Sequence, residues 1–221
     1  QYERSELQLK PTKIEKVEPI LWDRWLLLKI YCEDGTVGIG EAGVHGWQRP
    51  TKTMIETCTP YLLGKDPSLI EHHNQFLARS SHFMGSVVHG ALSAIDIALW
   101  DIKGKRLGVP IYDLMGGKTR NTVRCYQHVG GETLEELAAD AKKTVNEGFT
   151  AVRFSAFAPK FWLRRSYSEW AQAAVERVAA VRESVGPDID VCVEIHREMN
   201  PAESIALGKR LESFNPFFYE D

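Results

Sequence analysis

The stretch IDVCVEIH, residues 189–196, decides the fold, because it is a short apolar run that ends in two polar groups. Side chains of a β-strand alternate between its faces, so Glu194 and His196 would share one face. A second run, PFFYE at residues 216–220, ends in Glu220 in the same way. Carboxylates at the ends of successive parallel strands can converge on one hard cation, and an imidazole beside that cation can move a proton. The two runs predict a metal-assisted proton-transfer site on a barrel rim.

Outward from this stretch, predicted strands alternate with predicted helices. The strands are expected at residues 122–129, 150–155, 189–194 and 217–220. The helices between them are expected to open at Thr133 with a capping box, at Ser168, and at Asn200. Strand–helix alternation of this kind implies a parallel sheet, either doubly wound or closed into a barrel. The turn after the first strand, residues 130–132, lacks the glycine fingerprint of a dinucleotide-binding fold.

Residues 1–120 have a different pattern, which predicts an α+β unit. Residues 25–32 are strand-like, Asp34-Gly35 is a strong hairpin turn, and residues 36–42 would return as the partner strand. A long helix is indicated by apolar residues at helical spacing, with Ser86 as its cap. These apolar residues are Val88, Leu92, Ile95, Leu99 and Ile102.

The length of the second region is short for a complete barrel. A TIM barrel has eight strands and typically about 250 residues, so residues 121–221 would hold its first four strands. A half-barrel would leave an unpaired apolar strand edge, which natural proteins avoid. We therefore expect a longer protein that continues past Asp221, or a partner fragment that completes the barrel.

The composition argues against several classes of protein. The chain has 221 residues and a net charge of −3 without a basic stripe, so a nucleic-acid partner is not expected. No apolar run approaches the roughly 20 residues that span a bilayer, and the polar N-terminus lacks the apolar core of a signal peptide. The four cysteines have no zinc-type spacing, and we expect free thiols in a cytoplasmic protein.

The stretch GALSAIDIALWDIKGK, residues 90–105, resembles the signature helix of the mandelate racemase and muconate lactonizing branch of the enolase superfamily. Residues 108–117, residues 38–41 and residues 219–221 continue the resemblance, which covers the chain from about Lys13 onward. The resemblance implies an α+β capping domain on a (β/α) barrel. It also implies a Mg²⁺ ion held by acidic residues at the ends of the third, fourth and fifth barrel strands.

Carried over to this chain, the first two ligands of that ion are Glu194 and Glu220. The first position is more often Asp in the family, so Glu194 is a departure, and the third ligand would lie beyond Asp221. A His two residues after the first ligand resembles the acid-sugar dehydratases of this branch, the galactonate, gluconate and mannonate dehydratase-like enzymes. In that subgroup the residue that His196 matches protonates the leaving hydroxyl.

The general base is left open by the resemblance. Racemases and lactonizing enzymes usually carry a Lys-x-Lys pair at the end of the second barrel strand, where this chain has Arg153-Phe154-Ser155. In some mannonate dehydratase-like relatives an Arg at this place works with a Tyr on the next loop, which makes Tyr167 the candidate here. In galactonate-type relatives the base is a His on a late barrel strand, which residues 1–221 do not contain.

Two loops resemble the family's substrate-specificity regions. The one after the hairpin offers His45, Trp47 and Arg49 as pocket walls, and Trp22 lies in the other. His128, near the end of the first barrel strand, is a candidate rim residue. Relatives are commonly dimers or octamers, which predicts a homo-oligomer.

The leading hypothesis is Mg²⁺-dependent dehydration of an aldonic (sugar) acid to a 2-keto-3-deoxy acid. The steps are α-proton abstraction, stabilisation of the enediolate by the cation, and loss of the 3-hydroxyl assisted by His196. An epimerase or racemase on the same scaffold and a non-catalytic barrel fragment are the alternatives. Structural interpretations also stand beside the functional ones: the glutamates as surface residues, Arg153 in an ion pair, and Asp101 in a structural hydrogen bond.

Overall fold

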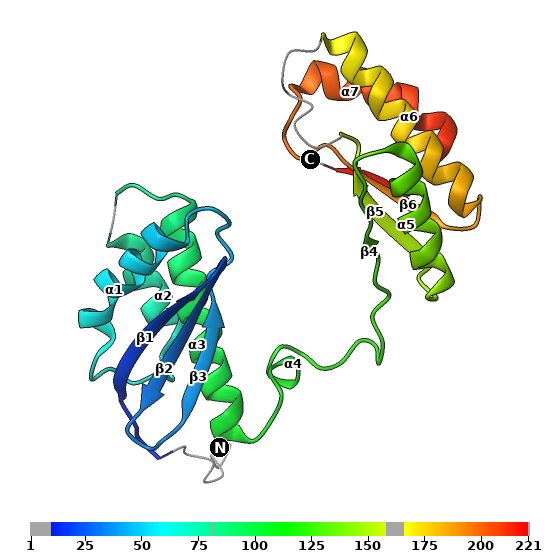
Figure 1. Cartoon of the computed structure of the whole chain (residues 1–221). Helices are drawn as coiled ribbons and strands as arrows, with labels where there is room; N and C mark the ends of the chain where they lie inside the picture. The colour runs from blue at the N-terminus through cyan, green and yellow to red at the C-terminus, as the bar shows by residue number, and fades with distance from the viewer. Residues whose placement is uncertain (1–9, 81, 158–165, 221) are drawn as a thin grey trace. The chain divides into compact units, whose positions relative to one another are not determined.

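The structure is a computed structural model in which residues 10–80, 82–157 and 166–220 are described. The chain divides between Asn121 and Thr122 into two compact units (Figure 1). Each unit has its own hydrophobic core. None of the helices in the described ranges combines the length and the apolar character needed to cross a membrane.

A three-stranded antiparallel sheet forms the base of the first unit, in the order β1-β2-β3. Its strands are β1 (Ile14–Trp22), β2 (Trp25–Cys32) and β3 (Val37–Glu41). Alternate side chains of β2 are buried, as a half-buried strand requires. The predicted strand, hairpin turn and return strand are therefore confirmed. The sequence pattern did not predict β1, which mixes polar with apolar residues and contains Pro19; proline is tolerated there because β1 is an edge strand.

Helices α1 (Gln48–Leu62) and α3 (Ser86–Leu107) pack on this sheet, and α2 (Ile70–Arg79) packs on α3 (Figure 1). A short helix, α4 (Ile111–Leu114), follows. The periodic apolar residues predicted the long helix α3 correctly. The expected Ser86 cap is wrong: Gly85 occupies the N-cap position, no side chain caps the helix, and Ser86 is its first helical residue.

Helix α3 approaches β3 so closely that two strand positions have room for glycine alone. A Cβ atom on Gly40 would lie 2.0 Å from the carbonyl oxygen of Ala94, and one on Gly38 would lie 2.1 Å from that of Ala98. Because strand side chains alternate, these two glycines face the helix together. The Gly-x-Gly pattern of the hairpin is therefore a packing requirement.

Side chains of α3 also satisfy the open edge of β3. The carboxylate of Asp101 accepts a hydrogen bond from the backbone N–H of Ile39 at 2.8 Å. Lys105 donates to the carbonyl of Val37 at 2.8 Å and to Asp101 at 2.7 Å. The structural interpretation of Asp101 is thus confirmed.

The second unit is a partial (β/α) barrel with four parallel strands in the order β4-β5-β6-β7 (Figure 1). This confirms the predicted fold class. The strands are β4 (Gln127–His128), β5 (Ala151–Ser155), β6 (Asp190–Glu194) and β7 (Phe218–Glu220). The helices are α5 (Leu134–Asn146), α6 (Tyr167–Val185) and α7 (Pro201–Leu211), and a 3₁₀ turn, η1 (Glu212–Phe214), follows α7.

The first barrel strand is much shorter than the eight residues that the sequence predicted. In β4 the ladder pairs with β5 are those of Gln127 and His128, and the N–H of Val129 adds one hydrogen bond to the carbonyl of Arg153 at 2.9 Å. Upstream, the side chain of Arg124 takes the place of ladder hydrogen bonds by donating to Thr150 and to Asp190. Alternating apolar residues predict a strand, but a strand forms only where its backbone can pair with a neighbouring strand.

Capping boxes begin all three helices of this unit. The helix starts predicted at Thr133 and Asn200 are confirmed. The second helix begins earlier than expected: Ser166 is its cap and Ser168 lies inside the first turn. The reason is Glu169, which stands three residues after Ser166 and completes the reciprocal hydrogen bonds.

The four cysteines are free thiols, as expected. Three are buried and Cys125 is exposed.

Candidate active site

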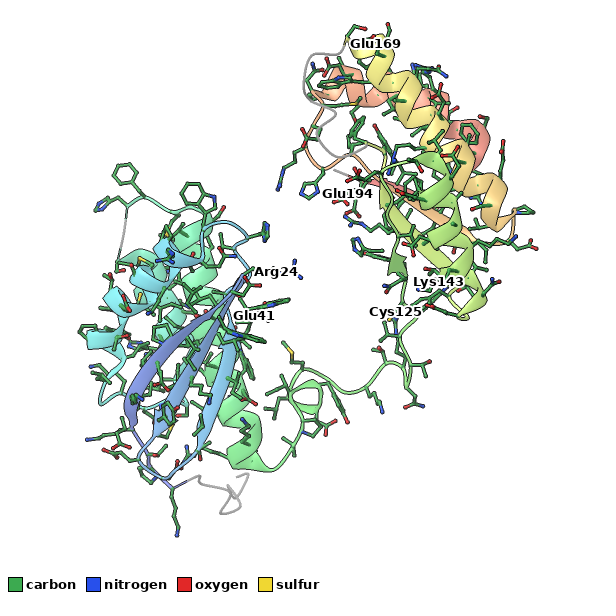
Figure 2. The ribbon with its side chains drawn as sticks, viewed as in Figure 1. Arg24, Glu41, Cys125, Lys143, Glu169 and Glu194 are labelled. Carbon is green, nitrogen blue, oxygen red and sulfur yellow. The ribbon has the colours of Figure 1, made fainter. Side chains whose placement is uncertain are left out.

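Two of the predicted metal ligands are neighbours in the barrel sheet. Glu194 is the last residue of β6, and the parallel ladder sets it directly beside Glu220, the last residue of β7 (Figure 2 labels Glu194). Neighbouring strands lie about 4.8 Å apart, and directly opposed side chains point to the same face. The carboxylates therefore share one side of the carboxyl edge of the sheet.

Arg153 joins these carboxylates. Its Nη2 atom donates to Oε1 of Glu194 at 2.5 Å and also to Oε1 of Glu220. The Arg153 side chain is 10% exposed, and that of Glu194 is 14% exposed. Burial acts to lower the pKa of Arg153, but the hydrogen bonds that it donates to Glu220 and Glu194 outweigh burial, and the pKa is raised. The sequence allowed two roles for Arg153, a functional residue or a partner in a structural ion pair. The structure shows the ion pair.

The rest of the guanidinium faces the β4 side of the site. Nη1 of Arg153 lies 3.2 Å from Nε2 and 3.3 Å from Nδ1 of His128, the rim residue suggested by the sequence. The guanidinium also lies 5.9 Å from the centre of the Tyr126 ring, in cation–π range. The Nε atom of Arg153 is buried without a hydrogen-bond partner among the described residues. The terminal nitrogens thus carry the polar contacts of this side chain.

His196 reaches the same cluster by a route that the sequence did not predict. Strand β6 ends at Glu194, so the two residues are not brought together by strand alternation. Instead, His196 and Arg197 adopt left-handed backbone conformations with φ of 50° and 59°. Such conformations cost about 1–3 kcal/mol each and are concentrated at functional sites. The turn puts Nδ1 of His196 3.1 Å from Oε1 of Glu194, with the imidazole 60% exposed.

The chemistry of this donor set fits a hard divalent cation. Oxygens of Glu194 and Glu220 converge on one point, which Nη2 of Arg153, a positive group, occupies. Carboxylate oxygens are the ligands that Mg²⁺ uses, usually one or two of them with water and substrate completing its octahedron. Within the described ranges no three His, Cys, Asp or Glu side chains are grouped to hold a metal ion. The pair could therefore supply two ligands of such a site.

Tyr167 has a structural contact. It is the first residue of α6, and its hydroxyl donates to the carbonyl of Glu203 on α7 at 3.2 Å. The loop before it, residues 158–165, lies outside the described residues. The predicted partnership of Tyr167 with Arg153 stays a prediction.

The substrate-loop candidates lie in the first unit. Trp22, at the end of β1, is 70% exposed, and Trp47, at the N-cap position of α1, is 60% exposed. Arg49 lies in the first turn of α1 rather than in a loop. His45 lines a cavity of about 330 Å³ with Arg24, Trp25, Glu41 and Val44. Their predicted role in binding substrate stays a prediction.

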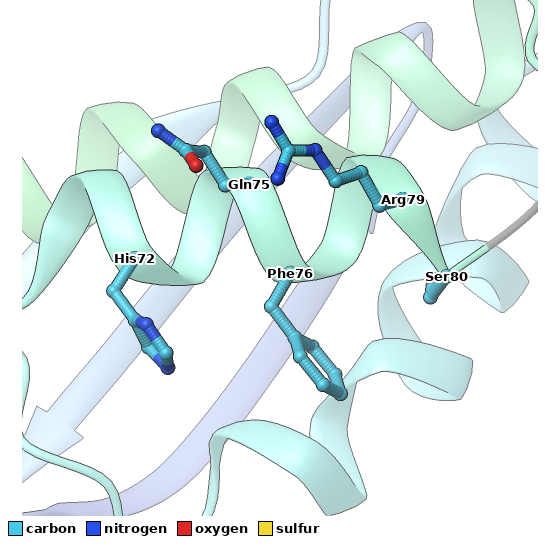
Figure 3. Close-up of a pocket in the computed structure, with 5 residues that line it drawn as sticks. All are labelled: His72, Gln75, Phe76, Arg79 and Ser80. Carbon is cyan, nitrogen blue, oxygen red and sulfur yellow. The ribbon is translucent and has the colours of Figure 1, made fainter.

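A second cavity, of about 390 Å³, was not predicted from the sequence. It runs along α2 and is lined by His72, Gln75, Phe76, Arg79 and Ser80. Figure 3 shows His72 and Phe76 projecting from one side of the helix and Gln75 and Arg79 from another. None of the residues predicted to form a site lines this cavity.

Two family profiles match the chain. The profile of the mandelate racemase / muconate lactonizing enzyme N-terminal domain matches residues 6–116. The chain belongs to this family. A profile described as the enolase C-terminal domain-like family matches residues 136–221. The resemblance read from residues 90–105 is thereby confirmed.

Curated relatives of this family are named as dehydratases. A D-galactonate dehydratase of Pectobacterium atrosepticum is 35% identical over 214 residues, covering 96% of this chain and 55% of the relative. The D-galactonate dehydratase family member ManD of Chromohalobacter salexigens is 33% identical over 225 residues, covering 89% and 55%. The chain thus spans about half the length of the curated relatives it matches.

Solved structures of the superfamily share the fold. An enolase from Pantoea ananatis with bound D-gluconate and Mg superposes with a TM-score of 0.85 at 28% identity, covering 95% of this chain and 60% of that one. A member of the enolase superfamily from Salmonella Typhimurium gives a TM-score of 0.86 at 28% identity, covering 94% and 60%.

Proposed function

We propose that the protein catalyses the Mg²⁺-dependent dehydration of an aldonic acid to a 2-keto-3-deoxy acid. One observation carries the proposal: the carboxylates of Glu194 and Glu220 share one positive charge, and the His196 imidazole lies 3.1 Å from Glu194. The names of the curated relatives and the D-gluconate in a structural neighbour support a sugar acid as the substrate class.

Glu194 and Glu220 are the residues that would hold the metal. When bound, Mg²⁺ would neutralise the negative charge that develops on the substrate carboxylate as the α-proton leaves. Glu194 and Glu220 lie at the ends of adjacent strands, so both ligands are held on rigid elements. Such preorganisation lowers the reorganisation needed as charge develops.

His196 would act as the general acid. Its contact with Glu194 fixes Nδ1, and the exposed remainder of the ring is open to substrate. The C2–H bond breaks as a base takes the proton, the C3–O bond breaks, and the oxygen leaves as water with a proton from His196. The resulting enol becomes the 2-keto acid. Proton transfer by a positioned group contributes about 10²–10⁴-fold to a rate.

The resemblance offers two bases: Arg153 with Tyr167, or a His on a late barrel strand outside residues 1–221. Hydrogen bonds to Glu220 and Glu194 raise the pKa of Arg153 despite its burial, so it is a poor proton acceptor while it bridges them. Proton abstraction by this side chain therefore requires that it first leave the carboxylates.

The proposal is tested by incubating the protein and Mg²⁺ with a panel of aldonates and assaying the 2-keto acid. His196→Asn should lower turnover by about 100-fold or more, because the general acid is lost. His72→Asn, on α2 of the first unit, is the matched control and should retain the rate. No turnover of any aldonate would refute the proposal. Exchange of the α-proton in deuterated water without loss of water would instead favour the epimerase or racemase.

A further inference from the structure

The place proposed for the metal is occupied by a group of the protein itself. Nη2 of Arg153 stands where the oxygens of Glu194 and Glu220 converge, at 2.5 Å from Glu194. A metal ion bound by both oxygens would need the same point, so the ion and the Nη2 atom of Arg153 cannot be there at the same time. We propose that Arg153 is an exchangeable internal cation: it closes the Glu194–Glu220 pair, and a divalent cation binds there only when the guanidinium leaves. This inference rests on the metal site of the proposed function.

The two carboxylates account for the presence of the guanidinium. They are direct neighbours in the parallel ladder, and their side chains are only 14% and 40% exposed. Like charges held this close repel each other unless a cation lies between them. The metal-free site therefore needs an internal positive charge, and Arg153 supplies it from the adjacent strand β5.

The remaining contacts of Arg153 show where the guanidinium can go. On the side away from the glutamates it meets His128 and the ring of Tyr126. An arginine can stack on an aromatic face while keeping its charge. The Nε atom has no hydrogen-bond partner among the described residues, so it does not fix the side chain in the bridging position. Buried polar atoms are nearly always hydrogen-bonded. The unpaired Nε atom is consistent with a side chain that moves between the glutamates and the Tyr126 ring.

Exchange predicts two measurable effects of replacing Arg153. Without Arg153, a divalent cation has no competitor and meets one positive charge fewer, so it should bind more tightly. Without the metal, the same variant leaves two neighbouring carboxylates uncompensated, so the added cation should stabilise the variant more than it stabilises the wild type.

The test is calorimetric titration of metal-free protein with Mn²⁺ and with Mg²⁺. Arg153→Met should bind Mn²⁺ at least tenfold more tightly than the wild type, and its melting temperature should rise more on saturation. Arg124→Met is the matched control, because Arg124 makes a similar ion pair, 2.6 Å from Asp190 at the other end of β6. Its metal affinity should equal that of the wild type.

A second measurement uses the wild type and does not depend on the folding of a variant. The guanidinium ¹⁵N resonance of Arg153, assigned with the conservative variant Arg153→Lys, should shift on addition of Mg²⁺, and that of Arg124 should not. An unchanged Arg153 resonance at saturating Mg²⁺ would overturn the inference.

The outcomes separate this inference from the proposed function. Equal Mn²⁺ affinity in Arg153→Met and wild type, with aldonate turnover intact in the wild type, overturns the exchange and leaves the proposed function standing. Failure of all three proteins to bind either metal overturns both the exchange and the metal site on which the proposed function depends.

Discussion

Replacing Gly40 by alanine should strongly destabilise the first unit, because β3 and α3 meet backbone to backbone at this residue. The added Cβ would lie 2.0 Å from the carbonyl oxygen of Ala94 and 3.2 Å from the amide nitrogen of Ala98. Ordinary contact begins at 3.4 Å, so the strand and helix would have to separate by about 1.4 Å. A carbonyl within a helix cannot turn aside as a flexible side chain can.

The size of the effect follows from the surface that would separate. Ala94, Ile95, Ala98 and Leu99 of α3 are fully buried. A gap of about 1.4 Å over roughly 100 Å² of contact opens about 140 Å³, and at ~24 cal/mol per Å³ the loss is about 3 kcal/mol. This is a large fraction of the 5–15 kcal/mol that is typical for a domain.

Urea unfolding monitored by tryptophan fluorescence measures this loss as a change in the free energy of unfolding. Gly43→Ala is the control, because a Cβ on Gly43 meets no atom within 4 Å. We expect a loss of about 3 kcal/mol for Gly40→Ala and less than about 0.5 kcal/mol for Gly43→Ala. Equal losses in the two variants would refute the reasoning.

Two further predictions concern titrating groups. Burial raises the pKa of Cys32 and of Cys192 to about 11, so about 0.1% of each is thiolate at pH 8. The exposed Cys125 should therefore account for the rapid reaction with a thiol reagent, and Cys125→Ser should abolish that phase; rapid labelling that persists in the variant would contradict this. Burial acts to raise the pKa of Asp34, but hydrogen bonds from a backbone N–H and from Arg106 outweigh it and lower the pKa. The stability from Asp34 is therefore present above the pKa of the unfolded chain and is lost as pH falls below about 4. Asp34→Asn should cost about 1 kcal/mol or less at pH 7, because the carboxylate is partly solvated, and the difference from wild type should vanish near pH 2 in urea unfolding.

The parts of the fold that the sequence predicted are those with local causes. The apolar spacing along α3 and the helix starts at Thr133 and Asn200 depend on residues three or four apart, and each was found. Strand β1 was missed because Pro19 and its polar neighbours are acceptable only at a sheet edge. That position depends on pairing with β2, which the local pattern does not contain.

The candidate site shows the same limit. Glu194 and Glu220 could be paired from the sequence, because parallel strands bring their ends to one edge. The position of His196 depends on a left-handed turn, and no glycine or asparagine signals that turn. The contact of Arg153 with both glutamates joins three strands, and only the folded sheet determines which partner an arginine takes.

The hydrogen bonds from Asp101 and Lys105 have a consequence for how the molecule behaves among its neighbours. They occupy the N–H of Ile39 and the carbonyl of Val37, groups that would otherwise be available to a strand from another chain. A second molecule could extend this sheet only by displacing both side chains of α3. The helix that forms the core of the first unit therefore also protects it from fibril-like growth at β3.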